Sequence, residues 1–211
     1  MASKGSIRLA KKRPDRYHHG DLRPALLEAA LRTIQKQGVH ALTLRAVGKD
    51  LGVSQTALYR HFADKAALLA AVAREGFRML RLALLGGWEQ PGKRLEGFVG
   101  MGVAYVRFAV ENPSHYRVMF SVNLDRAERD PELEAEGAGA FQVLVDALVE
   151  LQRAELVRRD DPQELALFIW AIVHGVAMLA IDGRLQKAHP DVDGLVRYSL
   201  ERLRTGIWLA P

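Results

Sequence analysis

Apolar residues recur along most of the chain at intervals of three and four, which is the spacing of one face of an α-helix. The first run consists of Leu22, Leu26, Leu27, Ala30, Leu31 and Ile34. Asp21 stands before this run and Gly38 follows it. A carboxylate can accept bonds from the free N–H groups of a helix start, and a glycine can adopt the positive φ of a helix end. The pattern therefore predicts a helix between these two residues.

Two shorter helices are predicted next. Thr43 can cap a helix that ends at about Leu51, and Gly52 stops it because glycine adopts the left-handed conformation most easily. Ser54 can cap a second helix that runs to about His61. A helix, a tight turn and a second helix are typical of a helix-turn-helix, whose second helix enters the major groove of DNA.

The remaining segments are also helical in pattern, and none alternates apolar and polar residues in the manner of a strand. Asp64 can cap a long helix, and the pair Gly86–Gly87 is expected to end it at about Leu85. The later helices are expected over residues 92–112, 113–121, 131–154, 161–185 and 191–209. The expected fold class is therefore all-α, with about nine helices.

Charge is distributed unevenly along the chain. Residues 1–65 contain thirteen Lys or Arg and five Asp or Glu, a net charge of 13 − 5 = +8, so the rest of this +5 chain carries −3. A basic first third favours a polyanion as its partner. Residues 1–20 have little apolar content and are expected to form a flexible basic arm, which either contacts DNA or is a solvated tail. The expected domains are this arm, a helix-turn-helix domain over 21–66 and a helical domain over 67–211.

Composition sets several other classes of protein aside. Of the 211 residues, 49% are hydrophobic and 26% are charged, which is a globular balance, and the absence of cysteine excludes disulfides and thiolate metal sites. The histidines are scattered and no catalytic set is recognisable, so neither an enzyme nor a metal or other cofactor is expected. We find no apolar run of about 18 residues and no apolar secretory segment, which predicts a cytoplasmic protein without a membrane partner.

The predicted second helix of the helix-turn-helix has two chemically different sides. Ala57, Leu58 and Phe62 are apolar and are expected to face the core, while Gly48 is small enough to let the two helices cross closely. The other sides carry Ser54, Gln55, Thr56, Tyr59, Arg60 and His61. Gln can bind adenine and Arg can bind guanine, whereas Ser, Thr, Tyr, His and Lys suit phosphates.

The segment "TLRAVGKDLGVSQTALYRHFADKAALL", residues 43–69, resembles the DNA-binding domain of TetR-type transcriptional regulators. The matching positions are Thr43, Gly52, Val53, Ser54, Leu58, Tyr59, His61, Phe62, Lys65 and Leu68. The resemblance covers roughly residues 22–70 and departs at Gly48 and Leu51, where the family usually has alanines. It implies a homodimer that binds a palindromic double-stranded DNA operator.

The resemblance and the side-chain chemistry together name the DNA-contacting residues. Phosphate contacts are implied for Thr43, Ser54, Tyr59, His61 and Lys65. Base contacts are expected from Arg45, Gln55, Thr56 and Arg60. The alternative for Tyr59 and His61 is packing at a joint between helices.

In this family the DNA-binding domain is coupled to a helical domain that dimerises and binds an effector. The stretch "WAIVHG", with Trp170, His174 and Gly175, is similar to the Trp-His-Gly signature of one subgroup. Apolar stripes on several helices are expected to border an effector pocket, and a packed core is the alternative. The candidate pocket residues are Phe98, Met101, Tyr105, Phe108, Tyr116, Met119, Phe120, Phe141, Trp170, His174 and Met178. His174 is either a ligand contact or a satisfied core histidine.

The expected function is that of a sequence-specific transcriptional regulator, a repressor released from its operator by a small apolar or aromatic effector. The last two helices carry more apolar surface than one bundle needs and are expected to form the homodimer interface. One rival is a helical enzyme, for which no catalytic set is seen. The other is a protein-interaction or small-molecule-binding module without specific DNA recognition. Salt-dependent affinity for one particular duplex separates the regulator from this second rival.

Overall fold

The structure, a computed structural model, describes residues 22–89, 94–121, 130–185 and 191–207. Within these ranges it contains nine α-helices, one short 3-10 helix and no strand, which confirms the expected all-α class. The elements are α1 (Leu22–Gln37), η1 (Val39–Ala41), α2 (Leu44–Leu51), α3 (Gln55–Tyr59), α4 (Lys65–Trp88), α5 (Arg94–Glu111), α6 (Pro113–Ser121), α8 (Pro131–Arg153), α9 (Pro162–Ile181) and α10 (Val192–Ile207). The basic arm and the expected cap Asp21 lie outside the described residues.

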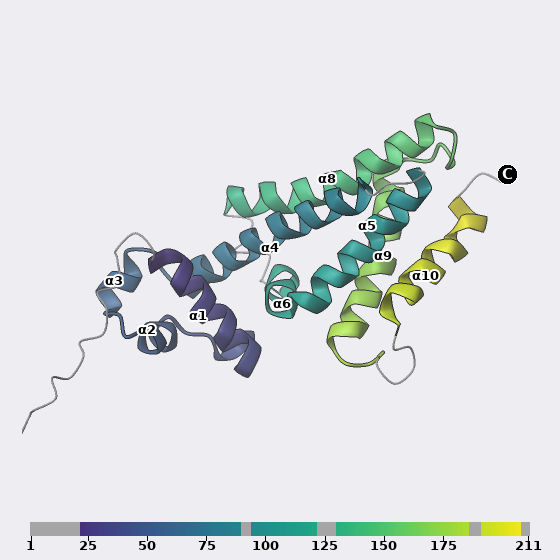
Figure 1. Cartoon of the computed structure of the whole chain (residues 1–211). Helices are drawn as coiled ribbons and strands as arrows, with labels where there is room; N and C mark the ends of the chain where they lie inside the picture. Colours follow the sequence, from purple (N-terminus) through teal and green to yellow (C-terminus); the bar gives the residue numbers. More distant parts are fainter. Residues whose placement is uncertain (1–21, 90–93, 122–129, 186–190, 208–211) are drawn as a thin grey trace, which may run out of the picture.

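The helices form two groups that share α4 (Figure 1). Helices α1 to α3 gather at one end of the molecule, and α4 leads from them into a bundle of α5, α6, α8, α9 and α10. In the bundle, α4 packs against α5, α6 and α8, while α5 packs against α9 and α10. Helix α1 also contacts both α4 and α6. The small group is therefore joined to the bundle through a continuous helix and through α6.

The short helices of the first group begin and end through local hydrogen bonds, as the sequence predicts. The side-chain oxygens of Thr43, Ser54 and Asp64 each accept a hydrogen bond from the backbone N–H three residues later, at 3.1, 3.2 and 2.8 Å. Gly38 and Gly52 follow α1 and α2 with φ angles of +81° and +66°, a conformation that favours glycine. These caps are confirmed, and they set where α2, α3 and α4 start.

Helix α4 is longer than its sequence predicts. The expected end at Leu85 is wrong, because the helix continues through Gly86 and Gly87 to Trp88. A β-carbon at Gly87 would stand 2.7 Å from the carbonyl oxygen of Gly100 on α5, which is too close for any side chain. The second glycine of the pair therefore serves a close crossing of α4 and α5 and does not end the helix.

Helix α9 corrects another expectation. By length and composition alone it is apolar enough to cross a membrane, although the sequence was expected to contain no such segment. Its buried residues Leu165, Ile169 and Val173 belong to the core of the bundle. A core helix of a soluble protein passes the same test of length and composition, so this helix is weak evidence for a membrane.

One connected apolar core runs through both groups of helices. At the end formed by α1 to α3 it includes Leu26, Leu58 and Leu68, which are fully buried or nearly so. In the bundle it includes Phe98 and Leu148. Because Leu68 lies on α4, the small group rests on the same helix that supports the bundle.

Replacing Gly87 by alanine is expected to destabilise the fold, because the new β-carbon overlaps the backbone of α5. Overpacking of this kind typically costs about 1–3 kcal/mol, and urea unfolding measures it. Gly86→Ala is the matched control, since no atom lies within 4 Å of its β-carbon position. There, the higher helix propensity of alanine should stabilise the protein by about 0.5–1 kcal/mol. Equal effects of the two substitutions would contradict the close crossing.

Candidate functional site

Helix α3 exposes its polar side chains to solvent and buries the side chain of Leu58. It ends at Tyr59, two residues earlier than expected, with Arg60 as its C-cap. Leu58 is 1% exposed, whereas Gln55, Thr56 and Arg60 are all exposed. Tyr59 is 55% exposed, which does not fit packing at a helix joint. The side chains of α3 that can form hydrogen bonds are therefore available to a partner.

A glycine sets the distance between α2 and α3. Gly48 is buried, and a β-carbon there would stand 2.9 Å from Cδ1 of Leu58. The N–H of Val53 donates to the carbonyl oxygen of Gly48 at 3.0 Å, and this bond closes the turn. The sequence-based expectation of a close crossing at Gly48 is confirmed. A β-carbon at this position would require the end of the Leu58 side chain to shift.

Capping leaves the hydroxyl groups of Thr43 and Ser54 free to donate. Both residues are exposed, and both use the side-chain oxygen as the acceptor of a cap bond. A hydroxyl group also carries one proton. That proton remains available to a phosphate oxygen, so capping and phosphate contact are compatible.

The other predicted contact residues flank this surface. Arg45 is exposed on α2, whereas His61 and Lys65 are half-buried. The ammonium group of Lys65 donates to the carbonyl oxygen of His40 at 3.2 Å. An ammonium group has three donors, so two remain for another acceptor. Of the nine predicted DNA-contacting residues, eight belong to α2, to α3 or to the residues next to these helices, and Lys65 is the first residue of α4.

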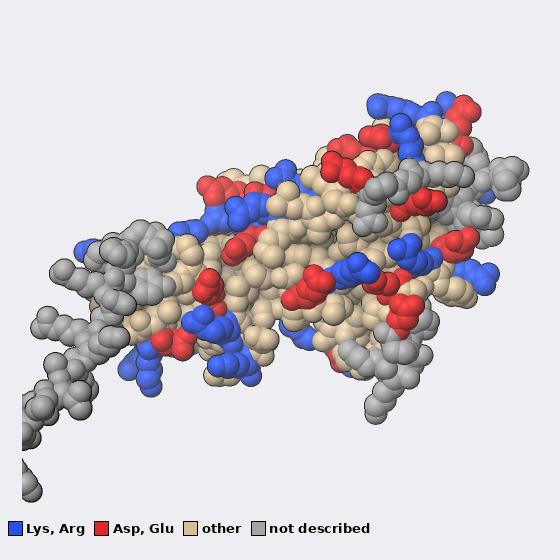
Figure 2. Space-filling view, viewed as in Figure 1, with Lys and Arg blue, Asp and Glu red and all other residues tan. Residues whose placement is uncertain are grey.

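The end of the molecule formed by α1 to α3 is basic. Among the described residues 22–65 there are seven Lys or Arg and three Asp or Glu, a net charge of 7 − 3 = +4. Figure 2 shows Lys and Arg side chains on this end of the molecule. Arg32 is neutralised by an ion pair with Asp50 at 3.0 Å, but Arg45 and Arg60 have no ion pair among the described residues. The charge favours a polyanion at the surface that carries α3.

A cavity of about 730 Å³ lies between α4, α5, α6, α8, α9 and α10. Its volume is within the range of small-molecule sites in proteins. Seven of the eleven predicted pocket residues are in its wall: Phe98, Met101, Tyr105, Met119, Phe120, Phe141 and Trp170.

The other four predicted pocket residues are not among those that line this cavity. The wall ends at Tyr105 on α5 and at Val173 on α9. Phe108 is buried in the core one turn beyond on α5, and Met178 packs against the core more than one turn beyond on α9. The remaining two, Tyr116 and His174, stand behind the wall as hydrogen-bond partners of Tyr105.

Sequence reasoning missed the wall that α4 contributes, and on α8 it named Phe141 alone. Phe77, Leu80 and Leu84 of α4 line the cavity, although no residue of this helix was among the predicted pocket residues. Their spacing of three and four was visible in the sequence. The other missed lining residues are Gly102, Ser121, Gly137, Ala138, Ala140, Leu144, Leu167, Ile169, Val173 and Leu200.

A cluster of four polar side chains closes one end of the cavity. The indole N–H of Trp170 donates to Oη of Tyr105 at 2.9 Å. That oxygen lies 2.9 Å from Oη of Tyr116 and 3.1 Å from Nδ1 of His174. The same Nδ1 lies 2.7 Å from Oη of Tyr116. The oxygen of Tyr105 therefore lies within hydrogen-bonding distance of all three other members of the cluster.

Burial keeps this cluster uncharged. It raises the pKa of Tyr105 to about 12 and raises the pKa of Tyr116, because the phenolate forms lose water. It lowers the pKa of His174, because the imidazolium form loses water. At neutral pH the cluster therefore consists of two phenols, an indole and a neutral imidazole. Among the described residues, no group of three or more His, Cys, Asp or Glu side chains could hold a metal ion.

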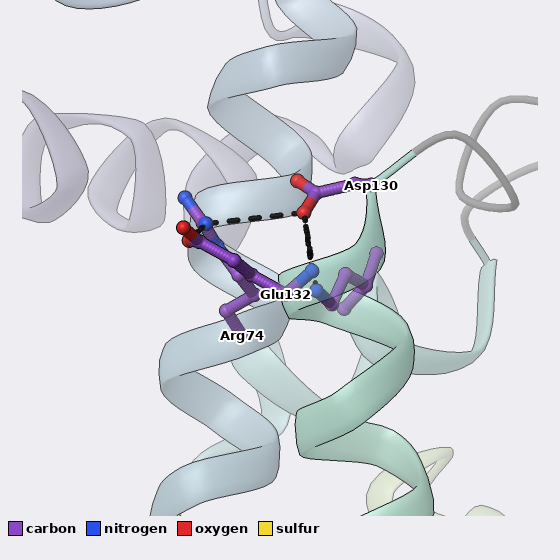
Figure 3. Close-up of polar contacts among 4 residues, drawn as sticks. Arg74, Asp130 and Glu132 are labelled. Atoms are coloured by element: carbon purple, nitrogen blue, oxygen red, sulfur yellow. Dashed lines mark hydrogen bonds and ion pairs between the residues drawn. The ribbon is translucent and has the colours of Figure 1, made fainter.

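An ion-pair cluster holds the start of α8 against α4 (Figure 3). Arg74 of α4 forms an ion pair with Glu132 and lies 3.9 Å from Oδ1 of Asp130. The same oxygen caps α8 by accepting the N–H of Glu132 at 3.2 Å and of Leu133 at 3.1 Å. These contacts hold α8, which forms one wall of the cavity, against α4, which follows α3 in the chain.

Known proteins resemble this chain over most of its length. The HTH-type transcriptional repressor AcnR of Corynebacterium efficiens is 28% identical over 189 residues, which are 85% of this chain and 93% of that protein. The HTH-type transcriptional regulator RutR of Escherichia coli is 29% identical over 155 residues, 70% of this chain and 69% of that protein. A solved structure of a protein with unknown function from Rhodococcus sp. RHA1 is 31% identical, with a TM-score of 0.79, over 94% of this chain and all (100%) of that one. The TetR family transcriptional regulator PfmR of Thermus thermophilus shares the fold at 18% identity, with a TM-score of 0.64, over 84% of this chain and 95% of that one.

Two family patterns match separate parts of the chain. Residues 26–72 match bacterial regulatory proteins of the tetR family, and residues 98–203 match the tetracyclin repressor-like C-terminal domain. The second match alone spans half of the 211 residues. The narrower resemblance to the Trp-His-Gly subgroup stays a prediction. The first match contains α2 and α3, the second contains most of the cavity wall, and the chain belongs to the tetR family of bacterial regulatory proteins.

Proposed function

We propose that this protein is a cytoplasmic repressor that binds a palindromic DNA operator as a homodimer and releases it when a small apolar or aromatic effector fills the cavity. The exposed polar side chains of α3, held over the buried Leu58, carry the proposal of DNA recognition. The names of two relatives support the class, since AcnR is called a transcriptional repressor and RutR a transcriptional regulator.

The proposal divides the chain into three parts. These are a basic arm over residues 1–20, a DNA-binding domain over 21–66 and an effector-binding and dimerisation domain over 67–211. In the DNA-binding domain, Arg45, Gln55, Thr56 and Arg60 would contact bases. Phosphate contacts would come from Thr43, Ser54, Tyr59, His61 and Lys65.

The cavity is well placed to influence the DNA-binding helices. Its wall includes Leu80 and Leu84 of α4 together with Met119 and Phe120 of α6. Helix α4 carries the DNA-binding helices at its start, and α6 packs against both α1 and α4. A ligand that fits one arrangement of α4 and α6 better than another would therefore favour one placement of α3. It can shift that balance only by its difference in affinity for the two arrangements.

The outer side of α9 supports a dimer. Phe168 is 50% exposed and Leu179 is 44% exposed, although both are large and apolar. Gly175 stands between them with open space where a β-carbon would be. An apolar helix face with a glycine at its centre suits close packing against the same helix of a second copy. A twofold axis would then hold two α3 helices about 34–36 Å apart, one turn of DNA, or a multiple of that distance.

Selection from a random pool of duplexes is expected to enrich one palindromic sequence, with affinity that falls steeply as salt increases. Arg60→Ala should bind the enriched sequence less selectively, because one side chain that can bind guanine is lost. We expect discrimination at one base pair of each half-site to fall by about tenfold or more. Binding titrations against single-base variants of the operator measure this effect.

Arg159→Ala provides the matched control for charge. Arg159 is exposed in the connection between α8 and α9, and it forms an ion pair with Glu155 at 3.5 Å. This connection lies at the end of the bundle opposite α1 to α3 (Figure 1). Loss of the Arg159 side chain should leave both affinity and discrimination unchanged. Failure of the wild-type protein to enrich any sequence would rule out the operator proposal. Unchanged discrimination in Arg60→Ala would remove only that residue from the base-contacting set.

Leu179→Asp is expected to convert the protein from a dimer to a monomer at micromolar concentration, because a carboxylate would be buried at the interface. Sedimentation velocity measures the change. Leu82→Asp is the control, since Leu82 is 62% exposed on α4 and lies outside the proposed interface. A wild-type monomer, or a dimer that withstands Leu179→Asp, would contradict a dimer through α9.

A further inference from the structure

Among the residues that the structure describes, the wall of the cavity contains no charged side chain. None of these lining residues is Asp, Glu, Lys, Arg or His, and their polar side-chain atoms belong to Tyr105, Trp170 and Ser121. Ser121 is exposed at the end of α6 and so lies at the edge of the cavity. The indole N–H of Trp170 is already bonded to Tyr105. Among the described residues of the inner wall, Tyr105 is therefore the one whose polar side-chain atom can both donate and accept a hydrogen bond.

A charged ligand would find no oppositely charged side chain among the described wall residues. A charge moved from water into an apolar site is costly unless an opposite charge or several hydrogen bonds meet it. Arg81 of α4 has a buried Nε without a hydrogen bond, but it does not belong to the wall. Its Cδ lies instead 3.7 Å from the β-carbon position of Gly139 on α8. The geometry thus disfavours both carboxylates and ammonium groups.

The oxygen of Tyr105 keeps one hydrogen-bonding position open. A phenol oxygen can donate one hydrogen bond and accept two. One acceptor position receives the indole N–H of Trp170, because an indole can only donate. The other two positions depend on how protons are arranged between Tyr105, Tyr116 and His174.

The neutral imidazole permits two arrangements of these protons. With the proton on Nε2, Tyr116 donates to Nδ1 of His174 and Tyr105 donates to Tyr116, so one lone pair of Tyr105 stays free. With the proton on Nδ1, His174 donates to Tyr116 and Tyr116 donates to Tyr105, so the proton of Tyr105 stays free. The first arrangement offers an acceptor to a ligand and the second offers a donor. Both satisfy the distances of 2.7 Å between Tyr116 and His174 and 2.9 Å between the two phenol oxygens.

This inference rests on the proposed regulatory function. We propose that the cavity selects an uncharged and largely aromatic ligand. The ligand carries one neutral oxygen group, a hydroxyl or a carbonyl, which binds to Oη of Tyr105. His174 and Tyr116 act as positioning residues that adapt this oxygen to a donor or an acceptor. Aromatic rings make up much of the wall, which suits a ligand with an aromatic body. They belong to Phe77, Phe98, Tyr105, Phe120, Phe141 and Trp170.

A matched series of biphenyl probes tests the proposal by isothermal titration calorimetry on the full chain without DNA. The series is biphenyl, para-phenylphenol, para-acetylbiphenyl, biphenyl-para-carboxylate and para-phenylbenzylammonium. We expect the phenol, the ketone or both to bind about tenfold tighter than biphenyl, which is the effect of one net hydrogen bond. The carboxylate and the ammonium should bind more weakly than biphenyl, because each brings an unpaired charge.

The wild-type series is decisive by itself. Equal affinity of biphenyl and both neutral oxygen probes would overturn the proposed hydrogen bond. A carboxylate or an ammonium that binds as tightly as the phenol would overturn the proposed neutrality, and failure of every probe to bind would overturn both. Because DNA is absent, none of these outcomes bears on operator binding, and failure of the operator proposal leaves this result standing.

Two variants locate the hydrogen bond. Tyr105→Phe should lower the affinity for the favoured oxygen probe to that of biphenyl while leaving biphenyl itself unchanged. Tyr198→Phe removes a hydroxyl group from an exposed tyrosine on α10, outside the cavity wall, and should change neither affinity. Loss of biphenyl binding in Tyr105→Phe would point to a collapsed cavity. In that case the affinities of the wild-type protein for the probe series decide whether the proposal holds. An unchanged preference in a Tyr105→Phe protein that still binds biphenyl would overturn the role of Tyr105.

Discussion

The structure depends on the close packing of one helix, α4, against helices of both groups. At its start it holds the small group through Leu68, and further along it approaches the backbone of α5 at Gly87. Arg74 adds an ion-pair cluster with the start of α8. A helix held at these points can move only if its partners move with it. The same helix contributes Phe77, Leu80 and Leu84 to the cavity wall, so the contents of the cavity and the placement of the small group are physically connected.

The polar cluster at the end of the cavity is a second constraint on the fold. Tyr105, Tyr116, Trp170 and His174 come from α5, α6 and α9, and each satisfies a polar atom of another. Removing one member would leave another buried polar atom unpaired, which costs more than the bond itself contributes. The cluster therefore fixes the relative positions of three helices. It also makes α6, which contacts α1, part of the boundary of the cavity.

One side of helix α9 packs into the core, and the other side is not covered by any part of the chain that the structure describes. Its buried side fills the core, while Phe168 and Leu179 remain about half exposed. By length and composition α9 could cross a membrane. A helix that is apolar on all sides is normally buried, and here one side is covered by the core. Under the proposed function, a second copy would cover the other side. This interpretation of the exposed side of α9 is made for a chain that belongs to the tetR family.

Local interactions explain what the sequence alone determined. The caps Thr43, Ser54 and Asp64, the turn glycine Gly52 and the all-α class follow from contacts between residues three or four apart. The two sides of α3 follow from the same short-range periodicity, which is why the exposed polar set near Leu58 could be named in advance. A resemblance to a known family was visible in this region because the spacing itself specifies the helix-turn-helix.

Contacts between distant segments decided the rest. Gly87 lies inside α4 because the backbone of α5 passes beside it, and nothing within the helix itself indicates that neighbour. The cavity includes Leu84 and excludes Phe108 and Met178, because its extent depends on where helices far apart in sequence cross. An apolar stripe looks the same in sequence whether it meets a neighbouring side chain or an empty volume. Short-range periodicity therefore determined the helices and the surface of α3, and only the tertiary packing decided which of their apolar faces would leave a cavity.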